Sequence, residues 1–143
     1  MAVRTAKAKW EGATVQAGKG TMALGSGAFQ GAYSFQSRFE EGAGTNPEEL
    51  IGAAHAGCYS MALTGTLSRN GLNPEWIATE AKVHLMKTDA GFTITTIELH
   101  TEAKVPGADA AKFAELAETA KQTCPVSRAL TGVKIELHAK LVA

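Results

Sequence analysis

Cysteine is scarce in this sequence, because only Cys58 and Cys124 occur among its 143 residues. In a reducing compartment, two cysteines far apart in the chain are more often catalytic, redox-active or simply buried than a structural bridge. A zinc site needs four ligands, usually in close Cys or His pairs. His55 lies close to Cys58, but no second pair accompanies them, so we expect no bound metal.

The chain also lacks an excess of charge of either sign, since 14 basic residues balance 14 acidic ones. This balance argues against nucleic acid or an anionic membrane as the main partner. The basic start, Met1 to Trp10, has no apolar run behind it, so we expect no signal peptide and a cytoplasmic location. The uncharged run Leu50–Ser68 holds His55 and several hydroxyl groups, which favours a buried helix over a membrane span.

A length of 143 residues suffices for a single domain, 1–143, that buries roughly two-thirds of its unfolded surface. Strands come first, followed by a long helix, a strand pair, a second helix and a last strand. This order predicts an α+β fold, mainly antiparallel sheets packed on a long buried central helix.

The central helix has clear ends. Asn46 can cap its start, Pro47 suits the first helical position, and Glu49 can reach back to the amide of the cap. Asn70-Gly71 is a typical stop. Because no charge interrupts the helix from Leu50 to Ser68, we expect it to be buried on nearly all sides.

Alternating apolar residues predict the strands. In Ala32–Phe39 the alternation places Arg38 on the side opposite the aromatic residues. A hairpin is expected at 89–91, with a bulge near 95–96 in its second strand. The other predicted strands are residues 3–9, 20–24, 77–85, 92–105 and 133–141, and helices are predicted after Asp109 and from Pro125 to Leu130.

The residues alone leave open which thiol is reactive. Cys124 precedes Pro125 at a predicted helix start, where backbone dipoles favour a thiolate, whereas Cys58 lies in apolar company that raises a thiol pKa. Cys124 is therefore the better candidate unless a cation lies near Cys58. His55 shares a helical face with Cys58 and could act as a base or ligand, but a buried, hydrogen-bonded histidine is the simpler expectation. His84, His100 and His138 fall on polar strand faces and are expected to be solvated.

Segment 44–63, GTNPEELIGAAHAGCYSMAL, closely resembles the OsmC/Ohr family of organic hydroperoxide reductases, a group of peroxiredoxins. The resemblance continues in the same order along essentially the whole chain. The further motifs are Trp10-Glu-Gly12, Gly18-Lys-Gly-Thr21, Arg38-Phe-Glu40, Asp89-Ala-Gly-Phe92, Val105-Pro-Gly107 and Cys124-Pro-Val-Ser127.

The resemblance implies a thiol peroxidase that serves stress defence and prefers organic hydroperoxides, with hydrogen peroxide as a further candidate substrate. Cys58 corresponds to the attacking cysteine and Cys124 to the resolving one. Arg38 corresponds to the arginine that activates the thiolate, and Glu48 to the carboxylate that holds this arginine. The resemblance also implies an intertwined homodimer, no cofactor, and a dithiol reductant, which in the Ohr branch is a lipoylated protein.

Glu48 and Cys58 are ten residues apart on one predicted helix, which is about 15 Å along its axis. An arginine paired with Glu48 therefore reaches the Cys58 of its own chain with difficulty. We expect Glu48 to meet Arg38 and Cys58 across a dimer interface. Two other readings stay open: a thiol-based redox sensor without efficient turnover, and a binding module whose cysteines are merely buried.

Overall fold

The computed structural model describes residues 1–142, and its elements confirm the predicted α+β class. The chain forms two compact units, one from Met1 to Leu50 and one that begins at Ile51. A single domain remains a prediction. Helix α2, Pro47–Arg69, starts in the first unit and continues through the second.

The first unit contains a three-stranded antiparallel sheet in the order β1-β2-β3. Its strands are Ala6–Glu11, Lys19–Leu24 and Gln30–Tyr33. The rings of Trp10 on β1 and Tyr33 on β3 pack with centroids 5.5 Å apart. This aromatic pair flanks the point where the chain leaves the sheet.

The predicted strand over residues 32–39 is wrong beyond Tyr33, because the chain turns into a short helix, α1, Phe35–Phe39. Ser34 caps this helix: its hydroxyl accepts from the Ser37 N–H at 3.1 Å, and the Ser37 hydroxyl accepts from the Ser34 N–H at 2.8 Å. Such a reciprocal box satisfies two amides at a helix start. Local serine chemistry therefore overrides the alternating pattern.

The predicted ends of α2 are confirmed. The Asn46 side chain accepts from the Glu49 N–H at 2.8 Å, and its amide donates to the Glu49 carboxylate at 3.3 Å. Glu49 thus reaches the side chain of the cap instead of the expected backbone amide. Gly71 ends the helix with φ of +77°, a left-handed conformation that glycine adopts without strain.

The expectation that α2 is buried on nearly all sides is wrong for the single chain. One uncharged stripe of the helix is exposed, and its largest side chain, Met61, is 79 % exposed. The helical spacing of three and four residues makes these positions one continuous face. We call this face the α2 stripe; it consists of Ala53, Ala54, Gly57, Met61, Thr64 and Ser68.

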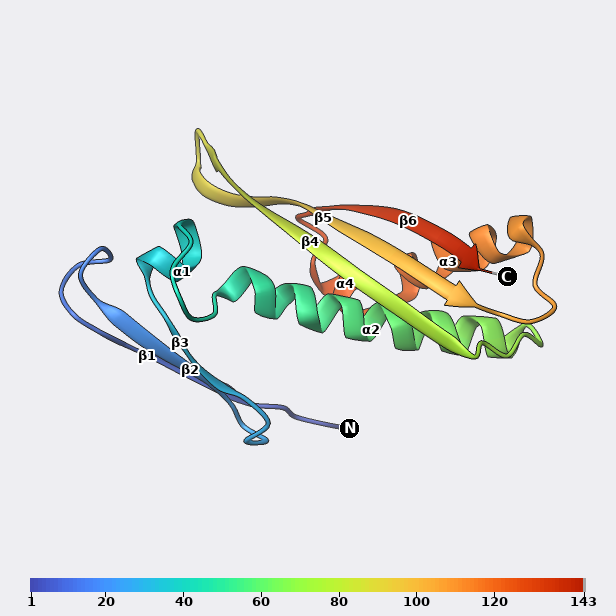
Figure 1. Ribbon diagram of the computed structural model, residues 1–143, viewed down its shortest axis with the longest axis horizontal. Helices are drawn as coiled ribbons and strands as arrows, with labels where there is room; N and C mark the ends of the chain where they lie inside the picture. The colour runs from blue at the N-terminus through green and yellow to red at the C-terminus, as the bar shows by residue number, and fades with distance from the viewer. Residues whose placement is uncertain (143) are drawn as a thin grey trace. The chain divides into compact units, whose positions relative to one another are not determined.

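The second unit is built on a three-stranded sheet in the order β4-β5-β6 (Figure 1). Strands β4 and β5 form the predicted hairpin, with its register shift opposite Thr95 between His84 and Leu85. Strand β6 pairs with β5 in parallel, so this sheet is mixed and not purely antiparallel. The strands are Trp76–Thr88, Gly91–Lys104 and Lys134–Val142.

One face of this sheet is covered by helices, and the hydrophobic core of the second unit lies between them. Tyr59 on α2 donates its hydroxyl to the carbonyl of Ala117 on α3 at 3.0 Å, which links the two long helices. The helices besides α2 are α3, Ala110–Thr123, and α4, Pro125–Ala129. The buried core is completed by Leu63, Leu67, Ile97, Leu99, Ala103, Val105, Phe113, Leu116, Ala120 and Cys124.

Among residues 1–142, no helix combines the length and the apolar character that a membrane crossing requires. The hydroxyl groups of α2 that argue against such a span are used within the protein. Ser60 and Thr66, for example, donate to the carbonyls of Ala56 and Ala62 one turn earlier, at 2.9 and 2.8 Å.

Candidate functional site

Arg38 and Glu48 form an ion pair inside the first unit. The Arg38 Nε donates to the two carboxylate oxygens at 3.0 and 3.3 Å, and Nη2 donates to Oε1 at 2.8 Å. The Glu48 side chain is 9 % exposed and the Arg38 side chain 36 %. Charge-assisted contacts through two guanidinium nitrogens fix the orientation of the arginine as well as its position.

This geometry corrects one expectation, because Glu48 meets Arg38 within its own chain and not across an interface. Both residues lie at structured helix positions: Arg38 in the last turn of α1 and Glu48 in the first turn of α2. A carboxylate at the start of a helix also faces the positive end of the backbone dipoles. Glu48 is bonded through Nε and Nη2, and the Arg38 side chain stays partly exposed.

An apolar pocket of about 230 Å³ lies beside Arg38 in the same unit. The guanidinium carbon is 5.2 Å from the ring centroid of the adjacent Phe39. The pocket therefore combines a cation with an aromatic wall. Its lining consists of Trp10, Val15, Tyr33, Ser34, Phe35, Arg38 and Phe39.

The two cysteines lie together in the second unit. Cys58 comes from the middle of α2, and Cys124 is the residue between α3 and α4. Their side chains are hydrogen-bonded to each other, and both are free thiols. Cys124 is fully buried, whereas Cys58 is partly exposed. Of the two, Cys58 is therefore the thiol that a molecule from solution can reach.

The electrostatics of Cys58 explain why it needs a cation. Burial raises the pKa of the Cys58 thiol, and the neighbouring Cys124 raises it further, while a hydrogen bond from the Val126 backbone N–H lowers it. The net shift is upward, so the second unit alone keeps the thiol protonated.

The start of α4 also serves the second thiol. The Val126 amide of its first turn bonds Cys58, and the Cys124 side chain, at the N-cap, makes no capping hydrogen bond. That the helix start favours a thiolate at Cys124 stays a prediction.

His55 is fully buried, as expected for a structural histidine, and joins the two cysteine-bearing segments. Its Nε2 lies 2.7 Å from the Ser127 hydroxyl on α4. Among the described residues, its Nδ1 has no hydrogen-bond partner. His55 precedes Cys58 by three residues, and Ser127 follows Cys124 by three. The bond therefore holds α4 against α2 beside both thiols.

Replacing Ser127 by Ala should destabilise the protein by about 1–3 kcal/mol, because it leaves a buried imidazole nitrogen unpaired. Urea unfolding measures this, with Thr119→Ala on the exposed face of α3 as the control. Equal stability of Ser127→Ala and the wild type would contradict a supporting role for the bond.

The same histidine predicts a pH dependence of stability. Burial lowers the pKa of His55 in the folded protein. The unfolded chain thus binds the proton more tightly. Stability should be complete above the unfolded pKa of about 6.5 and fall as the pH drops below it. In His55→Gln, the free energy of unfolding measured from pH 7.5 to 5 should no longer fall in this way. An unchanged pH dependence would mean that other groups cause it.

A sequence profile of the family described as "OsmC-like protein" matches residues 40–138. The chain belongs to the OsmC family. Peroxiredoxin OsmC of Escherichia coli is 52 % identical over 125 residues, which cover 87 % of each protein. An organic hydroperoxide resistance protein of Xanthomonas axonopodis is 35 % identical over 92 residues, covering 64 % of this chain and 63 % of the relative.

Solved structures of the family share the fold. The organic hydroperoxide resistance protein OhrB of Bacillus subtilis superposes with a TM-score of 0.71 at 28 % identity, covering 95 % of this chain and 98 % of that one. An organic hydroperoxide resistance protein OsmC from Legionella pneumophila gives 0.74 at 25 %, covering 99 % and 100 %. The profile match includes Glu48, Cys58 and Cys124, whereas Arg38 lies two residues before it.

Proposed function

We propose that this member of the OsmC family is a thiol peroxidase of the cytoplasm that reduces organic hydroperoxides to alcohols. The observation that carries the proposal is the direct contact between the thiols of Cys58 and Cys124. A buried, inert cysteine needs no second thiol beside it. The names of the relatives, a peroxiredoxin and organic hydroperoxide resistance proteins, support the same chemistry.

In the first step the Cys58 thiolate attacks the outer oxygen of the hydroperoxide, and the O–O bond breaks. The departing alkoxide takes a proton and leaves as the alcohol, while Cys58 becomes a sulfenic acid. The Cys124 thiol then attacks the Cys58 sulfur, which forms the disulfide and releases water. An external dithiol reduces the disulfide and is itself oxidised, and a lipoyl-type dithiol fits this role.

Arg38 is assigned to the activation of Cys58, and Glu48 to its positioning. Because burial raises the pKa of Cys58, the thiolate requires a cation, and arginine stays charged in a partly buried site. The same guanidinium would stabilise the negative charge that develops on the departing oxygen. Glu48 occupies one side of the guanidinium and directs the other side toward the reacting atoms.

The proposed active form is a homodimer whose two chains share each site. Ten residues of helix separate Glu48 from Cys58 on α2, so the Arg38–Glu48 pair of one chain is assigned to the Cys58 of the partner. The α2 stripe supports this assembly, because an uncharged face of small residues around an exposed Met61 suits close packing about a two-fold axis.

The apolar pocket beside Arg38 favours organic hydroperoxides over hydrogen peroxide. Its aromatic lining can bury the hydrocarbon part of the substrate while the hydroperoxide group meets the guanidinium. Hydrogen peroxide has no hydrocarbon part to pack against the aromatic lining and should be the poorer substrate.

Intact mass under non-reducing conditions tests the proposal. After one equivalent of cumene hydroperoxide, the wild type should lose two hydrogens, and Cys124→Ser should gain one oxygen on Cys58. An unchanged wild type with accessible thiols would contradict a peroxidase. Oxygen on Cys124 in a Cys58→Ser chain would reverse the two roles. Oxidation without sustained turnover in excess dithiol would instead indicate a redox sensor.

A further inference from the structure

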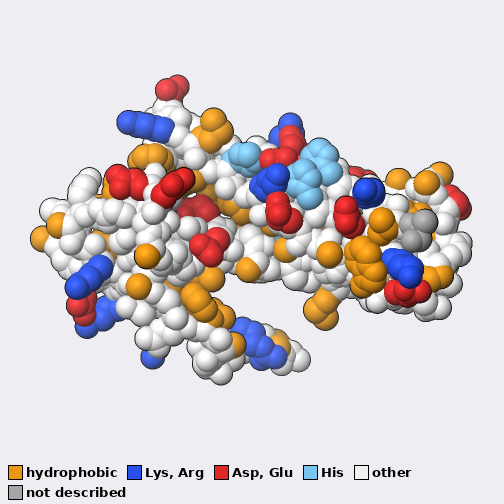
Figure 2. Space-filling model, in the orientation of Figure 1, with side chains coloured by type: hydrophobic (Ala, Val, Ile, Leu, Met, Phe, Trp, Pro, Cys, Tyr) orange, Lys and Arg blue, Asp and Glu red, His pale blue; other side chains and the backbone are white. Residues whose placement is uncertain are grey.

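Three histidines that the sequence pattern leaves to solvent converge on a single carboxylate. His84, Glu98, His100 and His138 come from the three strands of the second sheet, on the face opposite the helices. Figure 2 shows the histidine side chains gathered on one surface together with acidic and basic groups. We call these four residues the histidine cluster.

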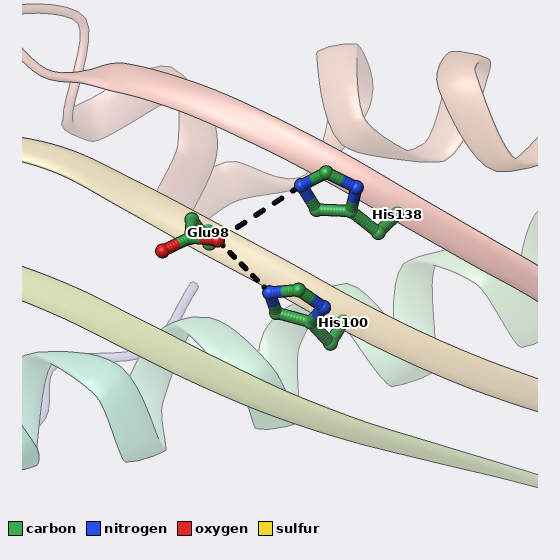
Figure 3. A group of neighbouring side chains, drawn as sticks. All are labelled: Glu98, His100 and His138. Carbon is green, nitrogen blue, oxygen red and sulfur yellow. Dashed lines mark hydrogen bonds and ion pairs between the residues drawn. The ribbon is translucent and has the colours of Figure 1, made fainter.

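The cluster has the geometry of a metal-ligand set. His100 Nε2 lies 3.1 Å from Glu98 Oε1, and His138 Nε2 lies 4.0 Å from the same oxygen (Figure 3). The two imidazole rings are stacked, with centroids 4.6 Å apart and planes at 12°. Both rings therefore present the same nitrogen to one point in front of the carboxylate.

The fourth member holds the carboxylate from its other side. His84 on β4 pairs through Nε2 with Glu98 Oε2, so Oε1 alone faces the two stacked rings. Such a contact behind a ligating carboxylate fixes its orientation and is common around metal sites. The arrangement divides the cluster into three candidate ligands and one positioning residue.

The neighbouring lysines form ion pairs with carboxylates other than Glu98. Lys82, directly opposite Glu98 in the register, pairs with Glu80 at 3.7 Å, and Lys134 pairs with Glu136 at 3.0 Å. Among residues 1–142, the ion-pair partners of Glu98 are the three histidines. The described ion-pair partners of the Glu98 carboxylate are thus imidazoles, whose ring nitrogens can bind either a proton or a metal ion.

We propose that Glu98, His100 and His138 bind one divalent transition-metal ion of the zinc class, with His84 as the positioning residue. Their ligand atoms lie within 4.8 Å of one another. Tetrahedral zinc at about 2.0–2.2 Å from each ligand needs ligand atoms about 3.3–3.6 Å apart, so rotation of the exposed side chains must close the farthest pair by up to roughly 1.4 Å. Imidazole ligands favour zinc, nickel or copper over magnesium and calcium.

The ion would join strand β6 to strand β5, because His138 lies on β6 and the other two ligands on β5. The remaining coordination positions face solvent. Binding to the folded state alone stabilises a protein by mass action, so zinc should raise the melting temperature. This site lies on the sheet face that carries no cysteine and is independent of the proposed peroxidase.

Calorimetric titration of zinc into the 143-residue Cys58→Ser/Cys124→Ser protein tests the proposal, since this background removes the competing thiols. We expect one ion per chain and a rise in melting temperature. Glu98→Gln and His138→Gln should each weaken binding by at least about tenfold. Glu102→Gln, the same charge change on the same strand face, is the matched control and should bind as tightly as the background. Magnesium should give no binding.

Histidine NMR spectra supply a second readout that does not depend on affinity. Zinc should shift the imidazole signals of His84, His100 and His138 and leave the buried His55 unchanged. Absence of binding, or equal binding by Glu98→Gln and Glu102→Gln, would overturn the proposal. Shifts confined to His55 would do the same, because they would place the ion elsewhere.

Discussion

Arg38→Met should slow the reaction of Cys58 with cumene hydroperoxide by about 10²–10³-fold, the usual cost of losing one preorganised charge-stabilising donor. The physical reason is that burial already raises the pKa of Cys58, and the Val126 amide compensates only in part. Without the guanidinium, both the thiolate and the departing oxygen lose their cation. Stopped-flow measurement of the first oxidation, before any reductant acts, isolates this step.

The pH profile separates a chemical role from a structural one. In the wild type, Arg38 should hold the Cys58 pKa low, so the rate should change little above neutral pH. In Arg38→Met the rate should keep rising as the pH increases, because the thiolate then forms only at higher pH. The pH profile of Arg38→Lys should lie between those of the wild type and Arg38→Met, since lysine keeps the positive charge but lacks the paired N–H donors of the guanidinium.

Arg128→Met is the matched control for this prediction. Arg128 lies in the last turn of α4, close in sequence to Cys124, and is exposed. Its loss should leave the rate within about twofold, as is usual for an exposed charge. If Arg128→Met slowed the reaction as much as Arg38→Met, the cation assigned to Cys58 would be wrong.

Mixing two defective chains should restore activity if each site is shared between chains. A purified heterodimer of Cys58→Ser and Arg38→Met contains one complete site in trans, formed by Cys58 of one chain and Arg38 of the other. We expect about half of the wild-type activity per dimer, whereas either parent alone is nearly inactive. Differential affinity tags on the two chains allow the heterodimer to be isolated.

The reciprocal heterodimer gives the opposite result. Wild type paired with Cys58→Ser/Arg38→Met has no complete site in trans but keeps one in cis. It should therefore be nearly inactive when the site is shared and half-active when it is not. Recovery in this pair and not in the first would show that Arg38 serves its own chain. Failure of any heterodimer to form would contradict the dimer itself.

Sequence patterns predicted the elements whose signals are local. The Asn46 cap, Pro47 start and Gly71 stop of α2 are confirmed, because capping and left-handed turns involve residues only a few positions apart. The β4–β5 hairpin and its bulge are confirmed for the same reason. Alternation failed after Ser34, where a serine capping box of four residues defined a helix instead.

The resemblance supplied the pairing of Arg38 with Glu48, and the structure places that pair in a single chain. The alternating strand pattern alone had predicted that Arg38 lies on the side opposite the aromatic residues. The difference arises because α1 rotates the side chain relative to a strand, and a five-residue helix is too short to leave a periodic signal.

The sequence by itself determined the family, the ends of the central helix, the two thiols and the α+β order of elements. Only the tertiary structure decided which thiol receives the Val126 amide, which face of α2 stays exposed, and that three strands bring their histidines to Glu98. The reason is distance along the chain. Caps and turns are local and can be read from neighbouring residues, whereas contacts such as His55 with Ser127, 72 residues apart, exist only after the chain has packed.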